Sequence, residues 1–287
     1  TAYRRQRQMC IRDRLSALLS IITGSLFAYL LYTYKNYLFI KFIAQTQSIL
    51  FVLPTIITVF GILSFYGNFF DIYGLTGILI GHVVLNTPIV SHIIYQTLNN
   101  ISPSEKLLSR QMGLGKFSSF LASEWPIIKK NIPSLFVLVT FICFVSFTPV
   151  LILGGSPKYS TLEVSIYYSV IFSNDFSTAL NLLIFQLIIC TVIYFVFFKN
   201  FKSENFFIDE YRQVKTYFHF KIHNFLELVI LLLIATCIFM PIIFIIIKGL
   251  NFKIISTIQS LYLLESLYNT FIICLFSGII STVLVYN

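Results

Sequence analysis

Long apolar runs separated by short polar links are the feature that most limits how this chain folds. Of its 287 residues, 57% are hydrophobic and 11% are charged, which leaves too few polar side chains for the surface of a soluble domain. An apolar helix of about 18 residues or more is long enough to span a bilayer. The sequence therefore predicts an all-α, polytopic transmembrane helical bundle with about seven spans. These spans cover approximately residues 15–32, 48–65, 75–97, 132–153, 179–198, 225–247 and 267–287.

The distribution of basic residues predicts the orientation of these spans. The links at 33–47, 98–131 and 199–224 together hold 12 Lys and Arg residues, whereas the links on the opposite side hold three. Cytoplasmic loops of membrane proteins carry the excess of Lys and Arg. The three basic links are therefore expected in the cytoplasm.

The polar interruption at residues 101–133 carries five of these basic residues and is expected to form two short helices. Ser102 is placed to cap the first, with Glu105 at the capping-box position three residues later. Gly113 is expected to end it, because glycine adopts the left-handed conformation common at helix ends. The second helix is expected to end at Pro126. By itself, such a segment is also typical of an ordinary cytoplasmic loop.

One spacing in this segment resembles the EAA loop of ABC-importer permeases. The family motif is E-A-A-x-x-x-G followed nine residues later by I-x-L-P, and here Pro126 follows Gly113 by thirteen residues. The chain departs from the motif at the E-A-A positions, which hold Leu107, Leu108 and Ser109, and at the I and L positions, which hold Ser123 and Trp125. The resemblance identifies a coupling loop that contains Glu105, Leu107, Leu108, Ser109, Arg110, Gln111, Met112, Gly113 and Pro126.

A wider region is similar to the thiamine permease family. It includes the run EWPIIKKNIPSLFVLVTFICFVSFTPVLILGGSPKYSTLEVSIYY at 124–168 and the segments FGILSFYG and YGLTGILIGHVVLNTP. That family resembles two fused permease halves. The resemblance implies a first half at 15–200, a cytoplasmic linker at 201–224 and the truncated start of a second half at 225–287.

Residues 1–14 are treated apart from the permease. The stretch TAYRRQRQMCIRDR contains five arginines and one aspartate, matches nothing in the permease family, and resembles translated vector or adapter sequence. It is interpreted as a non-native leader. A basic arm for nucleic acid is the alternative.

The resemblance implies a non-catalytic translocation subunit of a binding-protein-dependent importer in the bacterial inner membrane. The stretch 107–117 would dock on a cytoplasmic ABC ATPase dimer that binds ATP, so no cofactor is expected in this chain and no nucleic-acid partner. A periplasmic binding protein would deliver thiamine or its phosphates, and the permease would carry them across the lipid bilayer by alternating access. The nearest alternative is the related iron(III) importer permease. A passive channel or an intramembrane enzyme is the alternative from a different class.

Motifs for chemistry in this chain itself are sparse. The run Gly113-Leu114-Gly115-Lys116 lacks the spacing of a phosphate-binding loop, so ATP hydrolysis is assigned to a partner. His219 and His223 are four residues apart, but without a third ligand no metal site is predicted. Polar residues inside the spans either line a path or bond neighbouring helices. Asn86 and Gln186 are the first candidates for a translocation path, whereas His82 and His92 are expected to bond neighbouring helices.

The first span carries a pattern of small residues. Ser16, Ser20, Gly24 and Ala28 recur every fourth residue, which places them on one face of a helix. Small residues in this pattern allow a second helix to approach closely. A tightly packed partner helix is therefore expected along this face.

Overall fold

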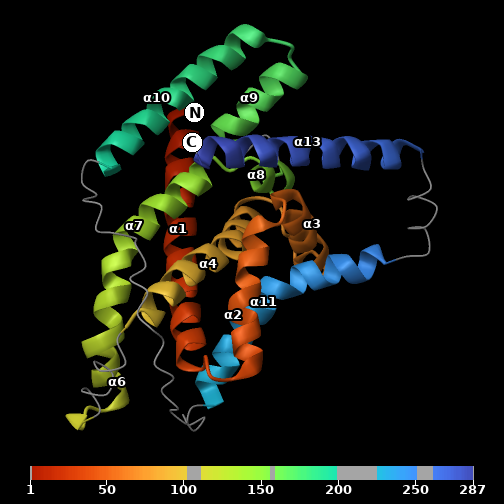
Figure 1. Cartoon of the computed structure of the whole chain (residues 1–287). Helices are drawn as coiled ribbons and strands as arrows, with labels where there is room; N and C mark the ends of the chain where they lie inside the picture. The colour runs from red at the N-terminus through yellow and green to blue at the C-terminus, as the bar shows by residue number, and fades with distance from the viewer. Residues whose placement is uncertain (1, 102–110, 156–158, 199–224, 251–260, 287) are drawn as a thin grey trace. The chain divides into compact units, whose positions relative to one another are not determined.

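The computed structural model describes residues 2–101, 111–155, 159–198, 225–250 and 261–286, and all regular elements in those ranges are helical (Figure 1). Six of these helices are long and apolar enough to cross a membrane, and a bent pair would add a seventh. The all-α polytopic prediction is confirmed. The elements are α1 (Ala2–Thr33), α2 (Leu38–Val52), α3 (Thr55–Tyr66), α4 (Leu75–Asn99), α6 (Lys116–Ser119), the π-helix η1 (Phe120–Glu124), α7 (Trp125–Phe144), α8 (Thr148–Leu153), α9 (Leu162–Ile171), α10 (Phe176–Phe198), α11 (Phe225–Gly249) and α13 (Leu261–Tyr286).

The chain divides into two units, Thr1–Ile242 and Ile243–Asn287. The second unit contains the last turns of α11 and the whole of α13. The described side chains of α13 are almost all exposed within the chain. The first unit contains every other helix and the packed core.

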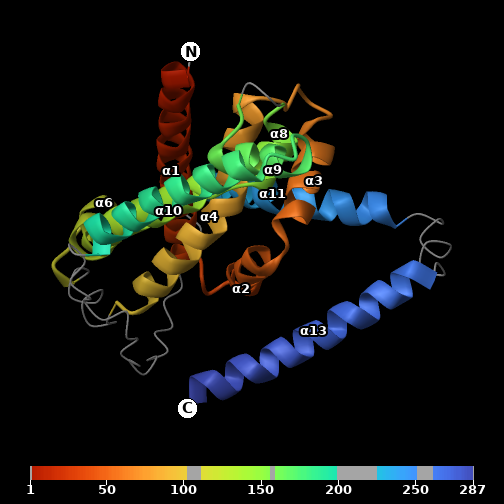
Figure 2. The ribbon, with the colours of Figure 1, turned by 90° about the horizontal axis from the view of Figure 1, so that it is seen from above.

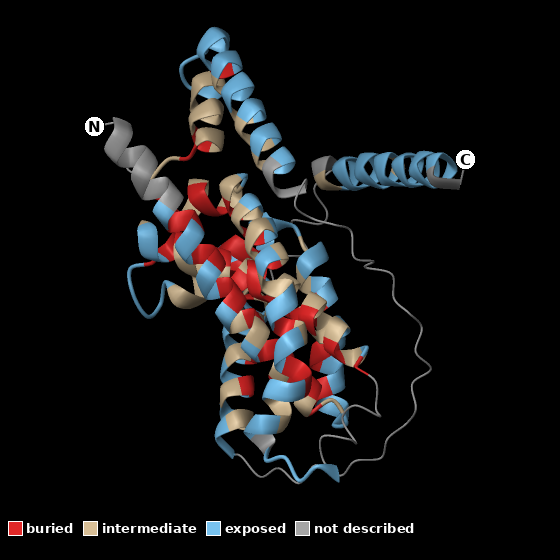
Figure 3. Cartoon of the chain, turned by 90° about the vertical axis from the view of Figure 1, so that its left-hand side faces the viewer, coloured by how far each residue is buried: buried red, intermediate tan, exposed pale blue. Residues whose placement is uncertain are grey.

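One core cluster of the first unit lies where α1, α4 and α7 meet, and Figure 3 shows the buried residues, in red, gathered inside the helix bundle. The small-residue face of α1 packs against α4, as predicted: Ser16, Ser20 and Ala28 are fully buried. A Cβ atom on Gly24 would lie 2.7 Å from Val90 Cβ of α4. This distance is too short for any larger residue, so glycine is what permits the close approach of the two helices.

The second span differs from its prediction. Instead of one helix over residues 48–65, the chain forms α2 and α3, which are bent by 112° relative to each other. Pro54 causes the break, because proline donates no backbone hydrogen bond and forces the residue before it out of the helical conformation. Leu53 accordingly has an extended backbone, with φ −60° and ψ 137°. Most of the predicted link at 33–47 is therefore helix α2.

Helix α3 packs against a proline kink in α11. Pro241 has no N–H, so the carbonyl of Cys237, four residues earlier, lacks its usual partner within the helix. The hydroxyl of Tyr66, at the end of α3, donates a hydrogen bond of 2.8 Å to this carbonyl. A Cβ atom on Gly61 would lie 2.6 Å from the carbonyl oxygen of Pro241. The two helices are thus in close contact where α11 is irregular.

The fourth span also differs from its prediction, and a further helix follows it. The expected span at 132–153 is interrupted after α7, and α8 follows as a separate short helix. Between the predicted spans at 132–153 and 179–198 lies the helix α9, whose first turn is capped by Thr161: its hydroxyl accepts a hydrogen bond from the N–H of Val164. Helix α10 returns alongside α9 (Figures 1 and 2).

Candidate functional site

The described part of the predicted coupling loop begins at Gln111. Glu105, Leu107, Leu108, Ser109 and Arg110 lie outside the described residues. Gly113 has φ +68°, which confirms the left-handed conformation predicted for it. Large apolar side chains around it are exposed, namely Met112 (71%) and Phe117 (72%). Exposed apolar side chains beside a fixed backbone corner can form a contact surface for another protein.

A π-helical turn follows this corner. In η1, the N–H of Trp125 bonds the carbonyl of Phe120, five residues earlier. Pro126 lies in the first turn of α7. Because α7 follows η1 without a break, the missing N–H and the ring of this proline fall inside a continuous helical stretch, where they would disturb a regular α-helix. The wider turn accommodates this residue, and the helix continues to Phe144. The prediction that Pro126 ends a short helix is therefore wrong, because the proline lies at a point where the helix changes its hydrogen-bond register.

The π-turn contacts helix α1. The ring of Phe120 lies edge-on to Tyr29 of α1, with ring centroids 4.8 Å apart. Glu124, the last residue of the turn, is 5% exposed. Its Oε2 atom accepts a hydrogen bond of 2.6 Å from the Ser123 hydroxyl. Sequence analysis missed Glu124, although an acidic residue two positions before Pro126 in apolar surroundings was a signal for it.

Two contacts place three predicted cytoplasmic links at one end of the bundle. Just after α1, Lys35 donates a hydrogen bond of 2.8 Å to Asn99, the last residue of α4. Its neighbour Tyr34 donates a hydrogen bond of 2.8 Å to Glu227, in the first turn of α11. Burial and the Glu227 carboxylate raise the pKa of Tyr34 above its usual value. The links at 33–47, 98–131 and 199–224 therefore all adjoin the same end of the first unit.

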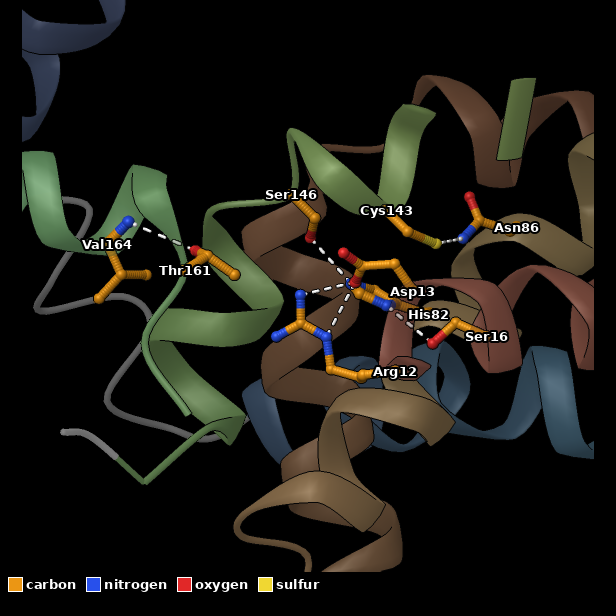
Figure 4. A network of polar contacts seen from close by, with 9 residues as sticks. All are labelled: Arg12, Asp13, Ser16, His82, Asn86, Cys143, Ser146, Thr161 and Val164. Atoms are coloured by element: carbon orange, nitrogen blue, oxygen red, sulfur yellow. Dashed lines mark hydrogen bonds and ion pairs between the residues drawn. The ribbon is translucent and has the colours of Figure 1, made fainter. Parts of the chain in front are cut away.

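A polar network joins the helices deeper in the bundle (Figure 4). His82 of α4 is 1% exposed. One of its ring nitrogens, Nδ1, lies 3.2 Å from the Ser16 hydroxyl of α1, and the other, Nε2, lies 3.0 Å from the Ser146 hydroxyl beyond α7. The expected interhelical role is confirmed for His82. His92 differs, since its Nε2 lies 2.7 Å from Gln96 Nε2 on the same helix.

Figure 4 also shows an ion pair between Arg12 and Asp13, 2.6 Å apart. Both residues are in the stretch interpreted as a non-native leader, and in the structure they belong to the first turns of α1. Helix formation by these residues does not test that interpretation.

The two path candidates lie in different surroundings. Asn86 of α4 is 2% exposed, and its Nδ2 donates to Cys143 Sγ at 3.4 Å, which links α4 to α7. Gln186 of α10 donates to the Glu163 carboxylate of α9, while its Oε1 is buried without a partner. The structure does not bring the two together by any described contact. Their assignment to a translocation path stays a prediction.

No cluster of three His, Cys, Asp or Glu side chains within the described ranges could hold a metal ion. His219 and His223 lie outside those ranges. The candidate site therefore consists of the exposed corner around Gly113 and the interface of α1, α4 and α7. The side chains that the structure describes there have polar and packing roles.

Comparison with known proteins identifies relatives of the chain. It is 35% identical over 195 residues to the thiamine transport system permease protein of Haemophilus influenzae, covering 63% of this chain and 36% of the relative. It is 29% identical over 291 residues to the protein of the same name from Escherichia coli, covering 94% of this chain and 53% of the relative. The Brucella abortus protein is 33% identical over 193 residues, covering 62% of this chain and 36% of the relative.

No family model matches the chain. The chain spans about half the length, or less, of the curated relatives it matches. The similarity to the Escherichia coli protein nevertheless extends through almost all of this chain. The resemblance predicted from the sequence is confirmed: the chain is a multi-helix membrane protein related to the thiamine transport system permease proteins.

Proposed function

We propose that this chain is part of the membrane-spanning permease of an ATP-driven importer that carries thiamine or its phosphates into the bacterial cytoplasm. The observation that carries this proposal is the similarity to thiamine permeases along 94% of the chain. The permease takes its substrate from a periplasmic binding protein and moves it by alternating access. The shared name of the relatives favours thiamine over iron(III).

In the proposed mechanism, the coupling loop docks on a cytoplasmic ATPase subunit. The left-handed corner at Gly113 holds the loop in a fixed shape, and the exposed side chains of Met112 and Phe117 supply apolar surface for the ATPase. A rigid element of this kind can transmit closure of the ATPase to the membrane helices. ATP is bound by the partner, so this chain needs no cofactor and no catalytic group.

The proposed orientation places the coupling loop in the cytoplasmic compartment, at the inner membrane. The shared end formed by Lys35, Asn99 and Glu227 supports it, because three links rich in basic residues adjoin that end. A reporter that is active only in the periplasm is expected to work when fused after Lys158 and to be inactive when fused after Lys116. Activity after Lys116 alone would reverse the orientation.

The proposed activity is tested with the full-length protein that contains this sequence, reconstituted in vesicles with its ATPase and its periplasmic binding protein. Labelled thiamine is expected to enter only when ATP is present on the ATPase side. Uptake without ATP would identify a channel, and transport of iron(III) in place of thiamine would favour the related importer. A complex that transports no thiamine, with or without ATP, would overturn the proposal.

A further inference from the structure

Three buried polar side chains of the first unit lack hydrogen-bond partners. Within the residues that the structure describes, six buried side-chain polar atoms have none, and three of the six are Gln47 Oε1, Thr58 Oγ1 and Ser91 Oγ. These residues are 1%, 4% and 0% exposed. A buried polar atom without a partner costs free energy. Such atoms inside membrane segments therefore call for a functional explanation.

Other hydroxyls in the bundle bond the carbonyl four residues earlier in their own helix. Ser20 does so at 2.8 Å, Thr46 at 3.0 Å and Thr97 at 3.2 Å. This local bond is the usual way in which a helical serine or threonine satisfies its hydroxyl. Thr58 and Ser91 do not form it, so their hydroxyls are available to another group.

Ser91 lies at the level of the break between α2 and α3. Along α4, Val84, Pro88, Ser91 and Tyr95 recur at intervals of four and three residues, so they share one face of the helix. Val84 belongs to a buried cluster with two residues of α3, and Tyr95 packs against a cluster that contains three residues of α2. Since Ser91 lies between these two contacts, it faces the region where α2 ends and α3 begins.

Gln47 and Thr58 lie on the two sides of that break (Figure 1). Gln47 is on the buried face of α2, where its Nε2 donates to a carbonyl of its own helix at 3.3 Å, which leaves Oε1 as the free atom. Thr58 is in the first turn of α3. Pro54 causes the break, and Pro88 leaves the Val84 carbonyl of α4 without its helical donor. The three side chains therefore approach one region, in which the helices are irregular.

We propose that Gln47, Thr58 and Ser91 contact the substrate as it passes the break of the second span. Many membrane transporters bind their substrates at interrupted helices, near the middle of the bilayer. All three side chains are uncharged, and the free atom of Gln47 only accepts hydrogen bonds, so the site suits an organic substrate with N–H or O–H groups. Thiamine has both, in the amino group of its pyrimidine ring and in its terminal hydroxyl. The inference rests on the proposed function and names the groups of the substrate that the permease contacts.

The test uses the reconstituted full-length complex with Gln47→Leu, Thr58→Val or Ser91→Ala. Ser20→Ala is the control, because Ser20 is also 0% exposed but has its hydroxyl bonded to the Ser16 carbonyl. The initial rate of ATP-driven thiamine uptake at saturating binding protein and the thermal stability of the permease are measured. Each test variant is expected to lower uptake by about fivefold, the effect of one hydrogen bond. Its thermal stability is expected to equal or exceed that of the wild type, because an unpaired buried polar atom has been removed. The control is expected to keep the wild-type rate.

The outcomes separate this site from the proposed function. A wild-type complex that takes up no thiamine would overturn the proposed function itself. If the wild type takes up thiamine, full uptake by all three variants would overturn the substrate contact and leave the proposed function intact. A variant that is destabilised, or is absent from the membrane, would show that its polar group supports the fold, which refutes the contact for that residue. An equal loss of uptake in Ser20→Ala and Ser91→Ala would refute the role of the unpaired hydroxyls.

Discussion

The hydrogen bond from Tyr66 to the kink of α11 allows a direct test of how the bundle tolerates Pro241. The substitution Tyr66→Phe removes only the hydroxyl that donates to the Cys237 carbonyl at 2.8 Å. That carbonyl has no helical donor, because residue 241 is proline. Hydrogen bonds between membrane helices contribute about 0.6 kcal/mol on average and up to about 1.7 kcal/mol. Since the carbonyl would be left without a donor, we expect a loss of stability of about 1 kcal/mol, in the upper part of that range.

The control is the same substitution in a Pro241→Ala background. Alanine restores a backbone N–H at position 241, which can bond the Cys237 carbonyl within α11, so Tyr66→Phe is expected to be nearly neutral there. The free energy of unfolding is measured for all four proteins in bicelles by denaturant titration, which gives the coupling between the two sites. An equal cost of Tyr66→Phe in both backgrounds would show that the Tyr66 hydroxyl does not compensate for the proline.

Two further predictions concern glycines, each with a matched control. Gly24→Leu is expected to destabilise the bundle by about 1–3 kcal/mol, because the added side chain meets buried Val90. The control Gly278→Leu is expected to be tolerated, because Gly278 has open space around it. Equal thermal stability of the two variants would contradict the packing of α1 on α4. Gly113→Val is expected to abolish ATP-driven thiamine uptake while the protein stays in the membrane, because a β-branched residue is strained at φ +68°. Gly115→Val, also in open space but without a positive φ, is expected to keep uptake, and full uptake by Gly113→Val would refute the role of the corner.

The spans could be predicted from the sequence because lipid imposes a simple requirement. Each crossing needs about 20 consecutive apolar residues in a hydrogen-bonded helix, and such runs are visible in composition alone. The small-residue face of α1 was equally predictable, since its period of four matches a helical face. The backbone at Gly113 followed from the preference of glycine for positive φ.

The consequences of the prolines were not predictable from the sequence. Pro54 bends the chain by 112° between two helices, whereas Pro241 lies inside a helix that continues past it. Pro126 was expected to end a helix, yet it lies in the first turn of one. The same residue type gives these different outcomes because neighbouring helices decide whether the freed carbonyl finds a donor and whether the ring finds room.

The partners of buried polar residues also required the structure. The sequence indicated that His82 bonds another helix, but Ser16 and Ser146 lie 66 and 64 residues away, and no pattern names residues at such separations. Asn86 and Gln186 could not be told apart by sequence, although the first joins α4 to α7 and the second faces Glu163. Glu124 was missed because its burial depends on how α7 packs against α1.

The contacts between α1 and α4 indicate how the chain crosses the bilayer between these two helices. They pair Ser16 with His82, Thr23 with Thr87, and Lys35 with Asn99, so residue numbers rise together along both helices, which run parallel. Parallel neighbours require an odd number of passages through the bilayer between them. The intervening chain is the bent pair α2–α3, and neither helix is long enough to cross alone, at about 22 and 18 Å. Together they therefore make one complete passage and do not return to the side from which they entered.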